Sequence, residues 1–168
     1  MNDSELERYI KLYHKTVLGT ALCYVRNTGD AEDITQEVFI KLYTYSGSFG
    51  NDEHVKAWLI RCTINRCKSL LRSYWYRFSE PLEAAEGKVH YDTGDDEGLS
   101  GALNRLDKNT RVVMLLHYRE GYKAKEIAAL LRTTESSVLH RLSRGRKQLR
   151  EILTGERNEA NDELQGNI

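Results

Sequence analysis

Residues 123–149 carry two short amphipathic patterns separated by a polar turn. In the first pattern the apolar side chains share one helix face: Ile127, Leu130 and Leu131, with the small Ala128 beside them. The turn is residues 132–134, Arg-Thr-Thr. In the second pattern the predicted buried stripe is Val138, Leu142, Leu149 and Leu153. This arrangement predicts two helices joined by a tight turn, a helix-turn-helix.

The second of these helices is rich in positive charge. Residues 101–155 contain twelve Lys or Arg against five Asp or Glu, and six of the cations lie between Arg132 and Arg150. A solvated helix face usually mixes both signs, so this excess favours binding to a polyanion over a merely solvated basic face. A basic second helix in such a motif is suited to the major groove of DNA.

The composition disfavours several classes of protein. No apolar run is longer than five residues, as at 112–116, which is too short to cross a membrane. The N-terminal residues lack the apolar core of a secretion signal, so we expect no membrane insertion and a cytoplasmic location. Three cysteines, expected to be packing residues, and five histidines occur without metal-ligand spacing, and no phosphate-loop or nucleophile motif is present. We therefore expect no metal, no cofactor, no catalytic residue and no enzymatic activity.

The remaining periodicity predicts an all-α chain. Before the helix-turn-helix, the expected helices span about 6–24, 30–46, 53–76 and 103–120. The turn cluster 27–29 ends the first helix, and Asp30 is expected to cap the second. Gly121 follows the fourth helix as its expected C-cap.

Residues 80–100 divide these helices into two groups. They contain seven acidic residues against Lys88 alone, and the only proline of the chain. Such a composition predicts a flexible acidic linker. The predicted fold is therefore two small helical domains, with a first domain at 1–79, an acidic linker at 80–101, a second domain at 102–155 and a polar tail at 156–168.

Three segments, in this order, resemble the extracytoplasmic-function sigma factors of bacterial RNA polymerase, in the sigma-70 family. They are Asp30–Phe39 (DAEDITQEVF), Ala57–Asn65 (AWLIRCTIN), and the helix-turn-helix with Glu126-Ile127-Ala128 and Ser137–Arg146. The resemblance covers nearly the whole chain. It implies a sigma region 2 helical bundle in the first domain and a sigma region 4 helix-turn-helix in the second.

The resemblance implies that the helix after residue 30 docks on the β′ clamp coiled coil of the polymerase. The matching residues are Asp33, Gln36, Glu37, Phe39 and Lys41. Helix capping is the alternative explanation for the acids, but a cap does not need polar residues beyond the first turn. The resemblance also implies contact of the chain with the β flap of core RNA polymerase, with promoter DNA and with an anti-sigma factor.

A second set of residues matches the part of the family that recognises and melts the −10 element. The loop residues Ser48, Phe49 and Asn51 would receive a flipped base, and Asn65 could pair with a base edge. Phosphates of the opened strand would be held by Arg61, Arg66, Lys68 and Arg72. For Trp58 two interpretations stay open, a core residue or a stacking platform.

A third set matches the positions that read the −35 element from the last helix. The base-reading positions are Leu139, His140, Ser143 and Arg144, and nearer the phosphates are Ser137, Arg141, Arg146 and Lys147. Arg144 is the leading base reader, because a guanidinium can bind O6 and N7 of guanine together. Leu139 departs from the family, where a cation is usual, and Arg132 stands where many relatives have glycine.

The implied function is that of an alternative sigma factor, which binds core polymerase and directs initiation through the −35 and −10 elements. A stand-alone helix-turn-helix regulator is the alternative; it predicts a dimer surface and leaves residues 30–72 unexplained. A small nuclease would need clustered acids for metal, whereas the acids here lie in a linker and a helix start. A pure protein-interaction module would not need a basic recognition helix.

Overall fold

The computed structural model describes residues 1–78, residue 91 and residues 97–166, and within them every regular element is helical. The predicted all-α fold is therefore confirmed. The chain divides into two compact units, Met1–Val89 with Ala129–Arg132, and His90–Ala128 with Thr133–Ile168.

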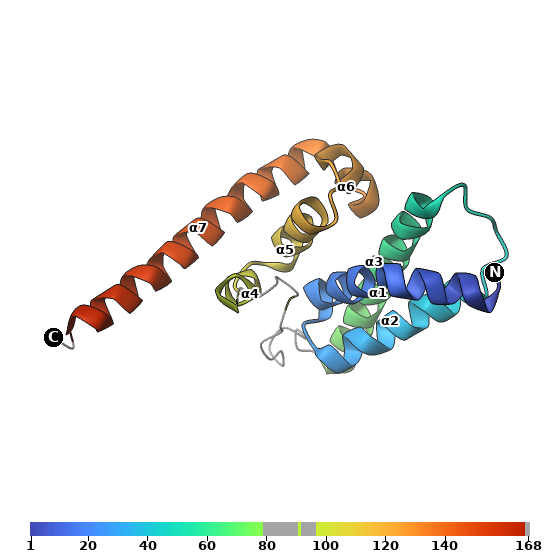
Figure 1. The fold of residues 1–168 in the computed structure, drawn as a ribbon, viewed down its shortest axis with the longest axis horizontal. Coiled ribbons are helices and arrows are strands. Elements are labelled where there is room, and N and C mark those ends of the chain that lie inside the picture. Colours follow the sequence, from blue (N-terminus) through green and yellow to red (C-terminus); the bar gives the residue numbers. More distant parts are fainter. Residues whose placement is uncertain (79–90, 92–96, 167–168) are drawn as a thin grey trace. The chain divides into compact units, whose positions relative to one another are not determined.

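The first unit is built from three helices: α1 (Asp3–Val25), α2 (Thr28–Tyr43) and α3 (Asp52–Phe78). Each packs against the other two, and α1 and α2 lie side by side (Figure 1). The interior is aliphatic, with Val17, Leu42 and Leu59 fully buried. Cys23 and Cys67 are also completely buried in this core and are not disulfide-bonded, as expected of packing residues.

The start of α2 differs from the sequence-based expectation. Asn27, not Asp30, is the N-cap, and its side-chain oxygen accepts a hydrogen bond from the backbone N–H of Asp30 at 3.0 Å. Asp30 lies inside the first turn, where its carboxylate still interacts favourably with the helix dipole. The prediction missed Asn27 because it placed this residue in the preceding turn.

The second unit contains α4 (Glu97–Asn104), α5 (Lys108–Met114), the π-helical turn η2 (Leu115–Arg119), the first five residues of α6 (Ala124–Leu131) and α7 (Glu135–Gly166). The single helix predicted over 103–120 is thus broken. Asp107 caps α5, and the buried Arg111 donates to the carbonyl oxygens of Leu103 at 3.1 Å and Leu106 at 2.6 Å. The Leu103 carbonyl also accepts the Leu106 N–H at 3.2 Å, so Arg111 adds a second bond there, while at Leu106 it binds a carbonyl at the break in the helix.

Most of the predicted linker lies outside the described residues, namely 80–90 and 92–96. The described part differs from an open tether. α4 begins at Glu97, within the predicted linker, and Tyr91 is only 2% exposed, with its backbone N–H donating to Ser100 Oγ at 2.9 Å. At the other end of this unit, α7 runs to Gly166, through most of the predicted polar tail.

The helix-turn-helix formed by α6 and α7 is present where it was predicted. Ile127, Val138 and Leu142 are buried at 3% exposure or less. Thr134 begins α7 by accepting the Ser137 N–H on its hydroxyl oxygen at 3.1 Å. Arg132 adopts a left-handed conformation (φ 52°), which explains why glycine is suited to this position.

Candidate nucleic-acid interface

A row of polar and basic side chains follows one face of α3. Arg61, Asn65, Lys68 and Arg72 are all exposed. At 100° per residue they fall within an arc of roughly 60°, and the row is about 16 Å long. A nucleic-acid strand could therefore place several phosphates along it while Asn65 reaches a base edge.

Arg66 does not belong to this row. It faces α2, where its Nε donates to one oxygen of Glu37 and its Nη2 donates to the other, Oε1, at 3.2 Å. The hydrogen bond from Arg66 lowers the pKa of the Glu37 carboxyl and raises that of the guanidinium. Two residues predicted to contact different partners therefore bind each other.

Three aromatic rings cluster where the α2–α3 loop meets α3. The ring centroid of Tyr45 lies 5.1 Å from the ring centroid of Phe49 and 5.1 Å from that of Trp58. The ring centroids of Phe49 and Trp58 are 5.8 Å apart. Phe49 and Trp58 are half-buried, whereas Tyr45 is 39% exposed. Lys41 Nζ lies 5.9 Å from the Trp58 ring centroid. Trp58 is thus half-buried in an aromatic cluster, not fully enclosed in the core, and its role as a stacking platform stays a prediction.

Tyr45 was not among the residues predicted from the sequence. It follows the end of α2, and its ring lies so close to Gly47 that a Cβ there would meet ring atoms at 2.5 Å. The available signal was an aromatic residue four positions before Phe49 with a glycine between them. We name Tyr45, Phe49 and Trp58 the aromatic cluster.

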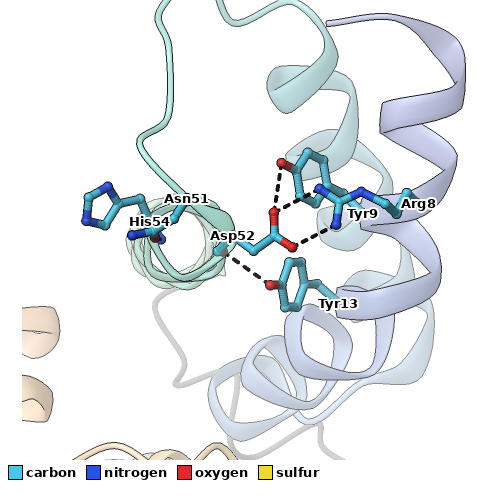
Figure 2. Close-up of polar contacts among 6 residues, drawn as sticks. All are labelled: Arg8, Tyr9, Tyr13, Asn51, Asp52 and His54. Carbon is cyan, nitrogen blue, oxygen red and sulfur yellow. Dashed lines mark hydrogen bonds and ion pairs between the residues drawn. The ribbon is translucent and has the colours of Figure 1, made fainter.

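The loop before α3 is held from two sides. Asn51 caps α3 by accepting the His54 N–H at 2.9 Å, so this predicted DNA contact also has a structural role. From α1, Arg8 donates two hydrogen bonds to the Asp52 carboxylate, at 2.7 and 2.8 Å, and the Tyr9 hydroxyl donates a third at 3.2 Å (Figure 2). These contacts fix the first turn of α3, while Ser48 in the loop stays exposed.

The residues predicted to contact the polymerase lie on α2 with one difference. Asp33, Gln36, Glu37 and Lys41 are exposed. Phe39 is only 6% exposed and instead lines a groove of about 350 Å³ between α1 and α2, together with Gln36. The Phe39 ring therefore packs beneath the exposed polar residues of α2.

On α7 the residues predicted to read DNA form an outward face. Leu139, His140, Ser143, Arg144 and Lys147 are exposed. They span an arc of about 140° on the side away from the buried Val138, Leu142 and Gly145. Ser137 and Arg141 are half-buried at the edge of this face. Arg146 points elsewhere, since its Nη1 donates to the Tyr118 hydroxyl at 3.0 Å.

Known sequences and structures match this chain over both units. Sigma-70 region 2 matches residues 9–77, and sigma-70 region 4 matches residues 97–149. RNA polymerase sigma factor SigV of Bacillus subtilis is 30% identical over 141 residues, which cover 81% of this chain and 83% of that protein. The chain belongs to the sigma-70 family, among the extracytoplasmic-function sigma factors. This sigma factor is accordingly a non-enzymatic initiation factor that acts with RNA polymerase at promoters.

Other relatives agree. ECF RNA polymerase sigma factor SigM of Mycobacterium tuberculosis is 26% identical over 151 residues, covering 88% of this sigma factor and 76% of that protein. The probable RNA polymerase sigma factor RfaY of Xanthomonas campestris is 27% identical over 161 residues, and this chain spans only 40% of its length. The fold matches the sigma factor RpoE, solved with the anti-sigma factor NepR from Bartonella quintana, with a TM-score of 0.73 at 22% identity over 89% of this chain and 97% of that one.

A second groove, not predicted from the sequence, lies within the region 4 unit of this sigma factor. It encloses about 570 Å³ and is lined by Tyr91, Leu99, Leu103, Met114, Leu115, Tyr118, Arg119, Arg146, Leu149 and Arg150. Leu115, Tyr118 and Arg119 belong to η2, and π-helical turns are frequent at functional sites. An apolar floor with arginines beside it is suited to binding a protein segment that is apolar and acidic.

Two further properties concern the part of this sigma factor that the structure describes. Among those residues, no group of three or more His, Cys, Asp or Glu side chains is placed to hold a metal ion. None of the described helices is long and apolar enough to span a membrane.

Proposed function

We propose that this sigma factor docks on the β′ clamp coiled coil through the exposed face of α2, with Asp33, Gln36, Glu37 and Lys41 as contacts. The groove of the region 4 unit would receive the β flap. An anti-sigma factor is proposed as the regulatory partner, and the cytoplasm as the site of action. The sigma factor RpoE of Bartonella quintana was solved with the anti-sigma factor NepR, and CnrH with the cytosolic domain of CnrY, so two proteins of similar fold each bind a protein partner, which supports the proposed regulation.

At the −10 element, the basic row on α3 and the aromatic cluster would act together. Arg61, Lys68 and Arg72 would hold phosphates, and an unpaired base would stack on the cluster at the N-terminal end of the row. Trp58 is the residue that connects the two, because it lies on the same face of α3 as the row. This continuity is the observation that carries the proposal, since stacking beside a cationic track is typical of single-strand binding.

At the −35 element, the outward face of α7 would enter the major groove. Arg144 would bind a guanine, Leu139 would contact an apolar group such as a thymine methyl, and Ser143, His140 and Lys147 would complete the face. Arg141 and Ser137, at its edge, would contact phosphates. Arg146 is better placed to contribute to the groove than to DNA, because it is bonded to Tyr118.

Run-off transcription with bacterial core polymerase tests this assignment. We expect initiation to require the protein, to fall about 10-fold or more in Gln36→Ala through weaker core binding, and to fall at low promoter concentration in Arg144→Ala. Lys11→Ala on α1 changes an exposed charge outside the proposed surfaces and should leave initiation unchanged. Tight dimeric binding to duplex DNA without core binding would instead support a stand-alone regulator.

A further inference from the structure

The proposed base reader of the region 4 unit is in contact with an acid on another helix. Arg144 Nη2 of α7 donates to Asp107 Oδ2, at the start of α5, at 3.2 Å. The two residues are 37 positions apart in the sequence and both side chains are about half exposed. An ion pair between exposed side chains contributes little to the stability of the fold. The importance of this pair therefore depends on how firmly the surrounding residues hold Asp107.

Asp107 is held rigidly by its neighbours. Its Oδ1 accepts the Thr110 N–H at 3.0 Å, and its Oδ2 accepts the Thr110 hydroxyl at 2.8 Å. Just before it, the Leu106 carbonyl is bound by the buried Arg111. Although burial acts in the opposite direction, these bonds and Arg144 lower the pKa of the Asp107 carboxyl. The carboxylate is therefore ionised and fixed on a backbone that cannot readily turn.

Gly145 brings α7 close enough for this contact. A Cβ at Gly145 would lie 2.9 Å from Thr110 Cγ2 and 2.8 Å from Met114 Sδ, both on α5. The side chain that follows Arg144 is thus absent where the two helices touch. Thr110 therefore has two contacts. Its N–H and hydroxyl orient the Asp107 carboxylate, and its methyl group packs against the α7 backbone at Gly145.

We infer that Asp107 is a positioning residue for Arg144, which it holds in the conformation that reads one base pair of the −35 element. The inference rests on the proposed function of the α7 face. One N–H of the guanidinium contacts Asp107, so other N–H groups remain to bind a guanine. An unrestrained arginine loses considerable rotamer entropy on binding a base, and a fixed carboxylate removes part of that loss in advance.

The opposite role would be competition, in which Asp107 withholds Arg144 from DNA. The two roles predict opposite effects when the charge is removed. Asp107→Asn suits this test because asparagine is an equally good N-cap and keeps an oxygen for the Thr110 N–H. Asp107→Ser is a second cap-preserving variant. Glu126→Gln is the matched control, since Glu126 also accepts a backbone N–H at a helix start, from Lys123 at 2.7 Å, without contacting Arg144.

The experiment is transcription by holoenzymes of the full-length chain on a promoter library randomised across the −35 element, with sequencing of the transcribed templates. Arg144→Ala should abolish the preference at one base pair. Asp107→Asn and Asp107→Ser should each weaken the preference at that same base pair by about three- to ten-fold, and leave the other positions as in wild type. Glu126→Gln should retain the full preference, and the melting temperatures should confirm that all variants fold.

The outcomes separate the inference from the proposed function. If Arg144→Ala keeps every preference, the base-reading assignment is wrong and the role of Asp107 falls with it. If Arg144→Ala loses one preference while the Asp107 variants retain or sharpen it, Arg144 reads DNA unaided or against competition, and the positioning role is overturned. A loss spread evenly over all positions in the Asp107 variants would also overturn it, because that result indicates damage to the fold.

Discussion

Arg132 shows how one backbone angle can decide the suitability of a residue. Its left-handed φ of 52° in the turn between α6 and α7 is unfavourable for a side chain with a Cβ. The family resemblance had marked this position because many relatives carry glycine there. The structure supplies the physical reason, since glycine adopts this conformation at no steric cost.

Arg132→Gly should therefore stabilise the protein by about 0.5 to 1 kcal/mol, and Arg132→Val should destabilise it by about 1 kcal/mol. Urea denaturation monitored by circular dichroism measures both changes. Ala129→Gly, at an exposed position in the interior of α6, is the control and should lower stability by about 1 kcal/mol, because its backbone is helical. Equal losses at both positions would show that the turn does not favour glycine.

Among the elements, α1 and α3 are joined by the pair of Arg8 and Asp52 beside the proposed −10 loop. The hydrogen bonds from Arg8 lower the pKa of the Asp52 carboxyl. A carboxyl with a depressed pKa stabilises the fold above its unfolded-state pKa, near 3.9, and this contribution is lost as pH falls through the folded-state value.

Arg8→Ala should thus lower the melting temperature by about 2 °C at pH 7, and the difference from wild type should shrink below about pH 4. Thermal unfolding at several pH values measures this, with Lys11→Ala as the control on the same helix. The Arg8 guanidinium also lies 4.4 Å from the Tyr9 ring centroid. A difference that persists unchanged to pH 3 would assign the effect to that packing instead of the charge pair.

The aromatic cluster belongs to the α2–α3 junction as a whole. If an unpaired base stacks on it, Tyr45→Ala should reduce open-complex formation by about 5- to 100-fold, and Tyr45→Phe should retain it, because the ring and not the hydroxyl stacks. Permanganate reactivity of unpaired thymines in holoenzyme–promoter complexes measures opening. Gly47→Ala should act in the same direction by displacing the Tyr45 ring. Normal opening in Tyr45→Ala would exclude stacking on this residue.

For the whole molecule, helical periodicity was sufficient to predict the all-α fold, the two-domain organisation and the helix-turn-helix, because each amphipathic pattern buries one face locally. The break at Asp107 was missed, since Leu103 and Leu106 continue the apolar pattern across it. The exposed residues of α2, α3 and α7 lie on the faces expected from their spacing. Their DNA and polymerase contacts stay predictions.

Helical periodicity does not predict which polar side chains on different helices contact each other. Glu37 and Arg66 are 29 positions apart, and Arg144 and Asp107 are 37 apart, so no local pattern relates them. Tyr45 was missed for a similar reason, because its ring acquires a role only when the loop brings Phe49 and Trp58 beside it. The Arg111 side chain was likewise counted as a surface charge, yet it is 2% exposed.

The pair of Glu37 and Arg66 has a consequence for the order of assembly. Glu37 is a proposed polymerase contact. Arg66 lies on the helix proposed for the promoter but outside the basic row, so it becomes available to DNA only when this ion pair is broken, and a ligand that takes either residue must break it. The second ligand then finds its residue already released. Thermodynamic linkage makes this assistance mutual: polymerase favours promoter binding by the same factor by which promoter favours polymerase. For a half-exposed pair that factor is at most about five-fold, enough to bias assembly without dictating it.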